Sequence, residues 1–351
     1  MKLKIAIMNG DDIGTEIVPM AKLVLTETLK ALGYSIQLID LPIGELAHSK
    51  YGDTLPEYTT SQLNEVHGII CGPIGHNKYP RNDSTWKMPP IRKKFELYAA
   101  IRPTKSYGDS KNIDIIFVRE LTEGLQSTDT IVGGYPEFRP NDEITIASRV
   151  ITRKGSNRVA KAAFDIALSK NRSKVTAAHK EPLFRLSCGM FLEECLKVSK
   201  QYPSISYEDA LIDTTAMHLV SNPESFDVVV TTNQFGDILS DIGAGLIGSI
   251  GMAPGLCLGD NIAMAQATHG SAPDIAGKNI ANPYAIIMST SMLLSWMGSK
   301  YNEEKLIMAS NIIEESTLEV IKERKYLTAD IGGKASTVDM TNAIIEKVKT
   351  K

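Results

Sequence analysis

Residues 4–33 read KIAIMNGDDIGTEIVPMAKLVLTETLKALG, and this stretch indicates the fold class. Lys4–Met8 is a short apolar run with β-branched residues that meets the turn pair Asn9-Gly10, which is typical of a buried strand. Apolar residues then recur at helical spacing from Ile17 to Leu32, and Gly33 ends the helix. Further strands are expected at 35–40, 66–71, 113–118, 175–178 and 227–231. Because strands alternate with helices, the sequence predicts an α/β fold with a mainly parallel sheet.

The other predicted elements are less regular. Glu143–Ile151 alternates apolar and polar residues, which predicts a strand, and a helix should follow at Asn157–Ser169. Asn282–Met297 is apolar and rich in methionine, so it should be a helix in the core or at a subunit interface. Segments 108–112 and 127–141 are the best candidates for loops.

Composition excludes several classes of function. The chain has 351 residues and a formal net charge of -3, so a nucleic acid or an anionic membrane is not expected as a partner. No stretch approaches the roughly 18 apolar residues of a membrane span. The four cysteines form no C-x-x-C pair, and their low number is typical of a reducing compartment. The N-terminal apolar stretch is too short for a secretion signal, so we expect a cytoplasmic protein, or an organelle-matrix protein already processed.

One glycine motif is misleading. Gly243-Ala-Gly245-Leu-Ile-Gly248 matches the G-x-G-x-x-G pattern of dinucleotide-binding folds. That pattern requires a strand before it, whereas the preceding residues, DILSDI, have a helical pattern. The glycines therefore indicate close packing of a helix rather than a Rossmann site.

Acidic residues form the strongest candidate site. Asp237 and Asp241 lie four residues apart in FGDILSD, so a helix would place both carboxylates on one face. Oxygen ligands suit Mg²⁺ or Mn²⁺, and Asp213, at a probable strand end, could be a third ligand. The alternative for such a pair is an ordinary solvated helix face.

Basic residues suggest an acidic substrate. Arg92, Arg102 and Arg119 flank short apolar runs, and converging guanidinium groups would bind a di- or tricarboxylate. Lys180 follows a short strand and could act as a base if it lies beside a metal. Taken singly, each of these residues could equally be an exposed surface cation.

The segment HGSAPDIAGKNIANP, residues 269–283, is dense in glycine and proline. It is expected to be a loop, and its polar residues His269, Asp274 and Asn282 suit a nucleotide site. A plain surface loop is the other interpretation.

Taken together, these segments resemble the β-decarboxylating dehydrogenases, the family of isocitrate, 3-isopropylmalate, homoisocitrate and tartrate/D-malate dehydrogenases. The resemblance runs nearly end to end. The segments that carry it are GDDIGTEIVP, RKKFELYAAIRP, RELTEG, DTTAMHLV, TTNQFGDILSD, HGSAPDIAGKNIANP and DIGGKASTVDMTNAI. It implies a two-domain α/β fold, not a Rossmann fold, with an open sheet running through both domains. Residues 1–98 and 251–351 would form a discontinuous NAD-binding domain, and residues 99–250 the dimerisation and metal/substrate domain.

The resemblance also implies roles for the candidate residues in a homodimer, or a larger homo-oligomer, whose active sites are shared between subunits. Arg92, Arg102 and Arg119 would bind substrate carboxylates. Asp237 and Asp241 would hold Mg²⁺ or Mn²⁺ together with Asp213 from the partner subunit, and Lys180, also from the partner, would be the general base. The cofactor would be bound by His269, Gly270, Asp274 and Asn282.

The choice of cofactor follows from charge. Asp274 and Ile275 stand where NADP-using relatives resemble Lys-Tyr. A carboxylate accepts hydrogen bonds from ribose hydroxyls and repels a 2'-phosphate, so NAD is expected.

Two positions depart from the family pattern. Gln126 stands where a tyrosine would protonate the enol, and an amide is not a useful general acid. Lys180-Glu181-Pro182 replaces the usual Lys-Ala-Asn. The enzyme could decarboxylate slowly, another acid such as Tyr135 could substitute, or the chain could be a non-catalytic regulatory subunit.

The substrate should depend mostly on residues 84–90, STWKMPP, which match neither the isopropylmalate nor the isocitrate pattern. Trp86 is faintly similar to tartrate/D-malate enzymes, whereas Lys87 could bind a distal carboxylate. The sequence therefore predicts NAD-dependent, metal-dependent oxidation of a malate-type 2-hydroxy acid. Isocitrate or homoisocitrate ranks first, tartrate or D-malate second and 3-isopropylmalate third.

Overall fold

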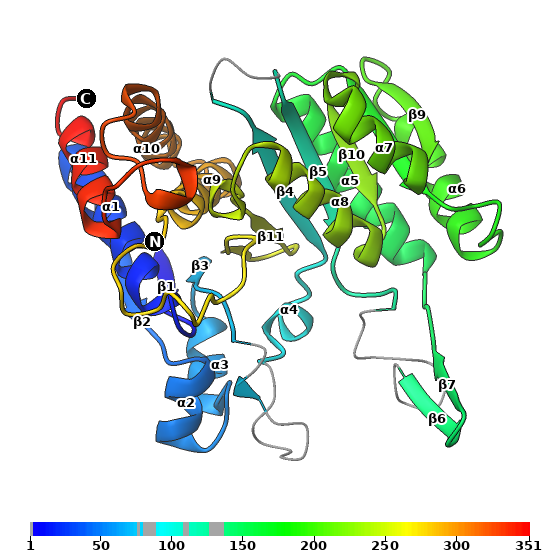
Figure 1. The fold of residues 1–351 in the computed structure, drawn as a ribbon, viewed down its shortest axis with the longest axis horizontal. Helices are drawn as coiled ribbons and strands as arrows, with labels where there is room; N and C mark the ends of the chain where they lie inside the picture. The colour runs from blue at the N-terminus through cyan, green and yellow to red at the C-terminus, as the bar shows by residue number, and fades with distance from the viewer. Residues whose placement is uncertain (1–2, 76–77, 80–88, 108–111, 126–136) are drawn as a thin grey trace. The chain divides into compact units, whose positions relative to one another are not determined.

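A computed structural model describes residues 3–75, 78–79, 89–107, 112–125 and 137–351 (Figure 1). The chain divides into two compact units, one formed by Met1–Phe95 with Gly248–Lys351 and the other by Glu96–Ile247. The first unit is therefore built from both ends of the chain. Among the described residues, no helix is both long enough and apolar enough to span a membrane.

Among the described residues of the first unit, the strands lie in the order β2-β1-β3-β12-β11. The first four run parallel, and β11 is antiparallel to β12. Their bounds are Lys4–Met8 (β1), Gln37–Asp40 (β2), Gly68–Cys71 (β3), Leu256–Leu258 (β11) and Ala263–Ala265 (β12). Residues of β1 and β3 are almost completely buried, as their apolar sequences predict.

Helices of the first unit follow its strands along the chain. They are α1 (Gly14–Ala31), α2 (Gly44–Tyr51), α3 (Glu57–Leu63), α4 (Ile91–Lys94), α9 (Tyr284–Tyr301), α10 (Glu304–Glu323) and α11 (Thr337–Val348). Helices α1, α9, α10 and α11 pack on one another (Figure 1). Twelve residues of α9 are buried within this unit, so the apolar segment predicted at 282–297 is a core helix.

The second unit has strands in the order β4-β5-β10-β8-β9. Strands β4 and β5 pair antiparallel, and the remaining pairs are parallel. Their bounds are Ala99–Lys105 (β4), Asp114–Glu120 (β5), Lys174–His179 (β8), Ser206–Leu211 (β9) and Val228–Thr231 (β10). The helices are α5 (Arg153–Ser169), α6 (Ser187–Ser199), α7 (Ile212–Ser221) and α8 (Asn233–Leu246). The predicted α/β fold class is thus confirmed.

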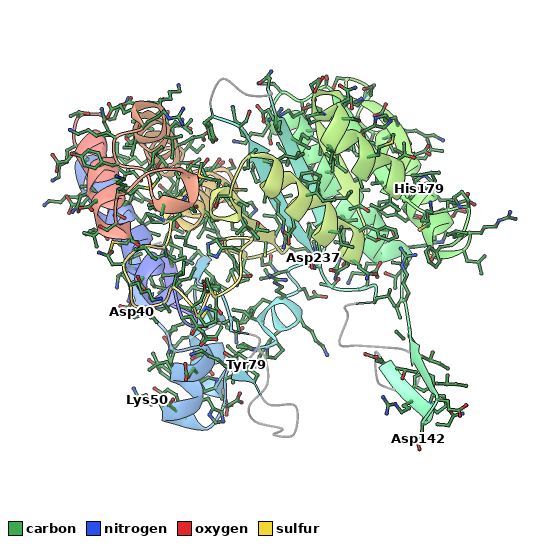
Figure 2. The ribbon with its side chains drawn as sticks, viewed as in Figure 1. Asp40, Lys50, Tyr79, Asp142, His179 and Asp237 are labelled. Atoms are coloured by element: carbon green, nitrogen blue, oxygen red, sulfur yellow. The ribbon has the colours of Figure 1, made fainter. Side chains whose placement is uncertain are left out.

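A separate two-stranded hairpin in the second unit corrects two predictions. Segment 137–141, expected to be part of a loop, is strand β6 (Glu137–Asn141), and only Ile144–Ala147 (β7) of the strand expected at 143–151 is extended. Phe138 pairs with Ile146 across the hairpin. Every residue of both strands is exposed, so no buried face imposes an apolar alternation on the sequence of β6, EFRPN (Figure 2). The rest of the two predicted loops, residues 108–111 and 127–136, lies outside the described residues.

The G-x-G-x-x-G segment is part of α8 and its end, as expected for close packing. A Cβ atom at Gly243 would lie 2.7 Å from Phe117 Cε2 and 2.9 Å from Thr104 Oγ1, so the glycine lets α8 approach β4 and β5. Because a helix precedes the glycines instead of a strand, the dinucleotide-binding interpretation is excluded.

Candidate active site

Arg119 and Asp237 form the centre of a charged cluster in the second unit. Arg119 lies near the carboxyl end of β5 and is 5% exposed. Its Nη1 donates to Asp237 Oδ1, while Nε and Nη2 donate to Asn233 Oδ1 at 3.1 and 2.7 Å. Gly236 makes this approach possible, because a Cβ atom there would lie 2.7 Å from the Arg119 side chain. In the FGD sequence, the glycine thus leaves room for the Arg119 side chain, and the aspartate pairs with its charge.

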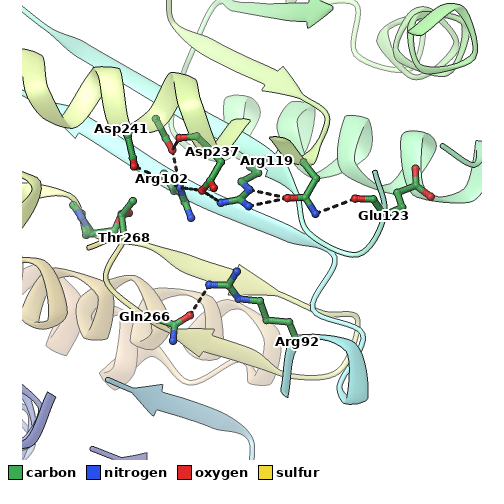
Figure 3. Close-up of polar contacts among 11 residues, drawn as sticks. Arg92, Arg102, Arg119, Glu123, Asp237, Asp241, Gln266 and Thr268 are labelled. Carbon is green, nitrogen blue, oxygen red and sulfur yellow. Dashed lines mark hydrogen bonds and ion pairs between the residues drawn. The ribbon is translucent and has the colours of Figure 1, made fainter. Parts of the chain in front are cut away.

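Arg102 joins the cluster from β4. It is 7% exposed, and its Nη1 donates to Ser240 Oγ at 2.7 Å and to Asp237 Oδ1 at 3.3 Å (Figure 3). Asp241 Oδ1 lies 4.0 Å from the same nitrogen. Two guanidinium groups and two carboxylates thus lie together on one face of α8, and the roles predicted for Arg102, Arg119, Asp237 and Asp241 stay predictions.

Burial and the neighbouring arginines act in opposite directions on the pKa of the α8 carboxylate Asp241. Burial raises the pKa of Asp241, and the neighbouring Asp237 raises it further, while Arg102 and Arg119 act in the opposite direction. A carboxylate held next to another in a partly desolvated position is stabilised by any cation that binds between them. The oxygen donors are of the kind that Mg²⁺ and Mn²⁺ prefer.

Lys180 and Asp213 form a second pair in the same unit. Lys180 follows β8, Asp213 lies in the first turn of α7, and Nζ donates to Oδ1 at 2.6 Å. This hydrogen bond lowers the pKa of the Asp213 carboxyl. Within the described part of one chain, no three acidic, histidine or cysteine side chains gather as a metal site, so Asp213 does not join Asp237 and Asp241 there.

His179 fixes the backbone on either side of Lys180. Its Nδ1 accepts from Glu181 N at 3.0 Å, so the proton resides on Nε2, which lies 3.1 Å from Asp209 Oδ2 (Figure 2). The ring is 6% exposed. Although Glu181 departs from the family pattern, its backbone N–H is hydrogen-bonded to His179.

Arg92 lies in α4 of the first unit. Its Nη2 donates to Gln266 Oε1 at 2.8 Å, and Gln266 Nε2 in turn donates to Gly72 O at 3.3 Å (Figure 3). The neutral amide of Gln266 thus holds the guanidinium group of Arg92 without neutralising its positive charge.

The loop at 269–283 is anchored to the first unit at several points. Glu16 of α1 accepts hydrogen bonds from Gly277 N and, at 2.9 Å, from Asn279 N, and Ile13 N donates to Ser271 O at 3.1 Å. Asn282 is buried, donates to Asp330 Oδ2 at 3.0 Å and accepts from Tyr284 N at 2.9 Å. Its side chain is therefore a structural link within the unit.

The loop residues expected to bind the cofactor differ in exposure. Asp274 and Gly270 are exposed. His269 is buried, its Nδ1 lies 2.9 Å from Gly270 O, and its Nε2 has no partner among the described residues. Burial lowers the pKa of His269, so at neutral pH Nε2 is an acceptor without a donor. This orphaned atom suits an external hydrogen-bond donor such as an adenine amino group.

Sequence reasoning missed Asn233, Ser240 and Gln266, which hold the three arginines in place. Asn233 and Ser240 lie four residues before and three residues after Asp237, so helical spacing could have placed them on the same face. Gln266 carries no comparable signal. Gln126, Tyr135, Trp86 and Lys87, which were expected to affect the substrate or protonation, lie outside the described residues.

Comparison with known proteins identifies the family. The model of the isocitrate/isopropylmalate dehydrogenase family matches residues 4–348. The chain belongs to this family. Its relatives include a homoisocitrate dehydrogenase of Methanocaldococcus jannaschii, 40% identical over 99% of each chain, and a 3-isopropylmalate dehydrogenase of Sulfurisphaera tokodaii, 38% identical over 99% of this chain and 100% of the relative.

A third relative, an isocitrate/homoisocitrate dehydrogenase of Thermus thermophilus, is 36% identical over the full length of both chains. Among solved structures, an isocitrate dehydrogenase from Methylococcus capsulatus superposes with a TM-score of 0.85 at 34% identity over 99% of each chain. The isocitrate dehydrogenase-like fold predicted from the motifs is therefore confirmed. The family assignment makes the chain a dehydrogenase and does not favour the regulatory alternative.

Proposed function

We propose that this dehydrogenase oxidises a malate-type 2-hydroxy acid with NAD and Mg²⁺ or Mn²⁺, and that the product loses CO₂. The observation that carries this proposal is the cluster of Arg102, Arg119, Asp237 and Asp241 on one face of α8. Guanidinium groups suit the carboxylates of the substrate, and the aspartates suit a cation that also binds the hydroxyl oxygen.

The metal site is proposed to need two chains. Asp237 and Asp241 would come from one subunit, and Asp213 and Lys180 from its partner. Exposed apolar side chains on α7 and α8, namely Met217, Val220 and Ile238, support a homodimer that buries these two helices. Such an arrangement would bring the third aspartate to the pair that one chain leaves incomplete.

For the cofactor, we propose NAD bound by His269, Gly270, Asp274 and Asn282. The buried acceptor on His269 supports recognition of an adenine ring, and the exposed carboxylate of Asp274 would accept hydrogen bonds from ribose hydroxyls and repel the 2'-phosphate of NADP. Asn282 would act mainly through its buried links to Asp330 and Tyr284, which fix the end of the loop.

In the proposed mechanism, Arg92, Arg102 and Arg119 bind and orient the substrate carboxylates. Lys180 accepts the proton of the 2-hydroxyl group, and Asp213, hydrogen-bonded to Nζ, orients the amine. When bound, the metal would supply Lewis-acid stabilisation of negative charge on the substrate oxygens, and the nicotinamide of NAD would supply the hydride acceptor for C2. Gln126 would not protonate the enol, so Tyr135 is the first candidate for that step.

The substrate ranking remains isocitrate or homoisocitrate first, tartrate or D-malate second and 3-isopropylmalate third. It rests on residues 84–90, where Lys87 would bind a distal carboxylate. Replacing Lys87 with methionine should raise the KM for a tricarboxylate much more than the KM for D-malate.

The decisive assay is NADH formation by the purified chain with Mn²⁺ and a panel of 2-hydroxy acids, compared with NADPH formation. We expect turnover with at least one malate-type substrate, a preference for NAD, and loss of activity with a chelator. Binding of a hydroxy acid without turnover of any member of the panel would instead support the regulatory-subunit alternative.

A second assay addresses decarboxylation. The ratio of CO₂ released to NADH formed should rise when Gln126 is changed to tyrosine, because a phenol can protonate the enol and an amide cannot. An unchanged ratio would show that protonation at this position does not limit the reaction.

A further inference from the structure

The segment that begins with Lys180 has exposed apolar side chains. Residues 180–186 connect β8 to α6, and the side chains of Leu183 and Leu186 are 71% and 89% exposed. Leu183 N and Phe184 N donate to Lys180 O at 3.2 and 3.0 Å, which turns the segment on itself. The position of Lys180 relative to the rest of the unit therefore depends on polar contacts at the ends of the segment.

Arg149, between β7 and α5, supplies such contacts. Its Nη1 donates to Ser187 Oγ at 3.2 Å, its Nη2 donates to Thr232 Oγ1 at 3.2 Å, and both nitrogens lie 3.5–3.6 Å from Cys188 Sγ. Lys180 N donates to the same sulfur at 3.4 Å. One atom of Cys188 thus connects the guanidinium group to the backbone of the lysine.

Two aromatic rings hold the guanidinium group as well. Arg149 Cζ lies 4.8 Å from the centroid of Phe184 and 5.2 Å from that of Phe235. Phe184 belongs to the segment that follows Lys180, whereas Phe235 belongs to α8, two residues before Asp237. The planar guanidinium group can stack and donate at once, which an ammonium group cannot do.

The charge of Arg149 stands in an unfavourable place. Ser187 is the first residue of α6, and Thr232 immediately precedes α8, so a cation here faces the positive ends of two helices. Every hydrogen-bond acceptor that the described residues offer Arg149 is neutral, and Thr232 makes no side-chain cap to α8. A neutral or acidic residue at this position would stabilise the two helices better than an arginine does. The contribution of Arg149 must therefore be something other than helix stability.

We propose that Arg149 is a positioning residue for Lys180, and this inference rests on the proposed role of Lys180 as the base. By joining Ser187, Cys188 and Phe184 to the start of α8, the guanidinium group fixes the lysine backbone at a set place in the unit. Without the Arg149 guanidinium group, the folded unit, the proposed metal ligands and the substrate-binding arginines should keep their places. The backbone of Lys180 should lose its fixed position, so that its amine is no longer held where it accepts the substrate proton.

The test is Arg149→Gln measured against Arg153→Gln. Arg153 begins α5 and makes surface ion pairs with Glu193 and Glu194, so it controls for loss of an arginine in this region. We expect Arg149→Gln to lower kcat about tenfold or more, with the KM for the hydroxy acid and the half-saturating Mn²⁺ concentration within about twofold of the unmodified protein. Arg153→Gln should leave all three unchanged.

A second pair of variants decides the matter if Arg149→Gln does not fold. Cys188→Ala removes the shared sulfur, and Cys195→Ala removes another buried thiol of the same helix that has no contact with Arg149 or Lys180. Only Cys188→Ala should lower kcat at constant KM. Unmodified kcat in Arg149→Gln or Cys188→Ala, or an equal loss in the matching control, overturns the proposal.

Lys180→Met, assayed in parallel, distinguishes failure of the proposed function from failure of the positioning role of Arg149. If Lys180→Met turns over normally, or if the unmodified chain does not turn over at all, the proposed function fails. If Lys180→Met is inactive while Arg149→Gln and Cys188→Ala keep their kcat, only the positioning role fails.

Discussion

At the scale of single residues, the charges of the site were readable from the sequence and their supports were not. Asp237 and Asp241 stood out by their four-residue spacing, and Arg102 and Arg119 because they flank short apolar runs. Asn233, Ser240 and Gln266 did not, because amides and hydroxyls are common in every loop and helix. Their function appears only when hydrogen bonds show that they hold guanidinium groups.

Asp237→Asn should lower NADH formation by at least about a hundredfold, because the amide removes a proposed metal ligand and the partner of two arginines. Asp165→Asn is the matched control, since Asp165 lies on α5 and its partners in the described part of the chain are Lys161 and Tyr202. Activity and Mn²⁺ dependence that remain in Asp237→Asn within about threefold would exclude Asp237 as a ligand.

His269 predicts a pH dependence of stability. Burial lowers its pKa below the 6.5 of an unfolded chain, so the unfolded state binds more protons in the window just below pH 6.5. The contribution of this residue is therefore complete above pH 6.5 and is lost as the pH falls, at no more than about 1.4 kcal/mol per pH unit.

Denaturant unfolding at pH 7.5, 6.5 and 5.5 checks this expectation. The free energy of unfolding should fall less steeply on acidification in His269→Gln than in the unmodified protein. Equal slopes in the two proteins would mean that His269 titrates alike in the folded and unfolded states.

At the scale of elements, burial explains most of the strand predictions but not all of them. The partly exposed strand β2 was expected at 35–40, whereas the largely buried strand β4, AAIRPTK, was not expected. Strands β1, β3, β5, β8 and β10 are continuous apolar runs because helices or neighbouring strands bury them, and each was expected within a few residues of its observed bounds. Strand β9, SYEDAL, is an edge strand that pairs with β8, and none of its residues is buried. Its sequence is therefore polar and gives no apolar pattern from which a strand could be predicted. Strands β11 and β12 have three residues each, too few for a pattern.

Helix α8 offers a direct test of close packing with two neighbouring glycines. Gly243→Ala should lower the free energy of unfolding by about 1–3 kcal/mol, because the new Cβ meets Phe117 and Thr104. Gly245→Ala has nothing within 4 Å and should raise it by about 0.5–1 kcal/mol through helix propensity. Thermal or denaturant unfolding measures both, and the same sign of change in the two variants would refute this packing account.

At the scale of the whole molecule, the motifs identified the family, and the residues proposed for catalysis lie in separate groups within one chain. Lys180 is paired with Asp213, and Asp237 with Arg102 and Arg119, and the described residues contain no complete metal site. If two subunits assemble a site, their assembly depends on the shape and chemistry of both surfaces. The spacing of residues along one sequence therefore does not predict it. The proposal that sites are shared between subunits is the central claim about this protein.

Subunit complementation tests that claim most directly. Lys180→Met and Asp237→Asn, each inactive alone, are unfolded together, refolded and assayed for NADH formation. If Lys180 of one chain serves Asp237 of its partner, half of the random dimers are mixed and each has one intact site, which restores about a quarter of the unmodified activity. A mixture that stays as inactive as its components would contradict the account.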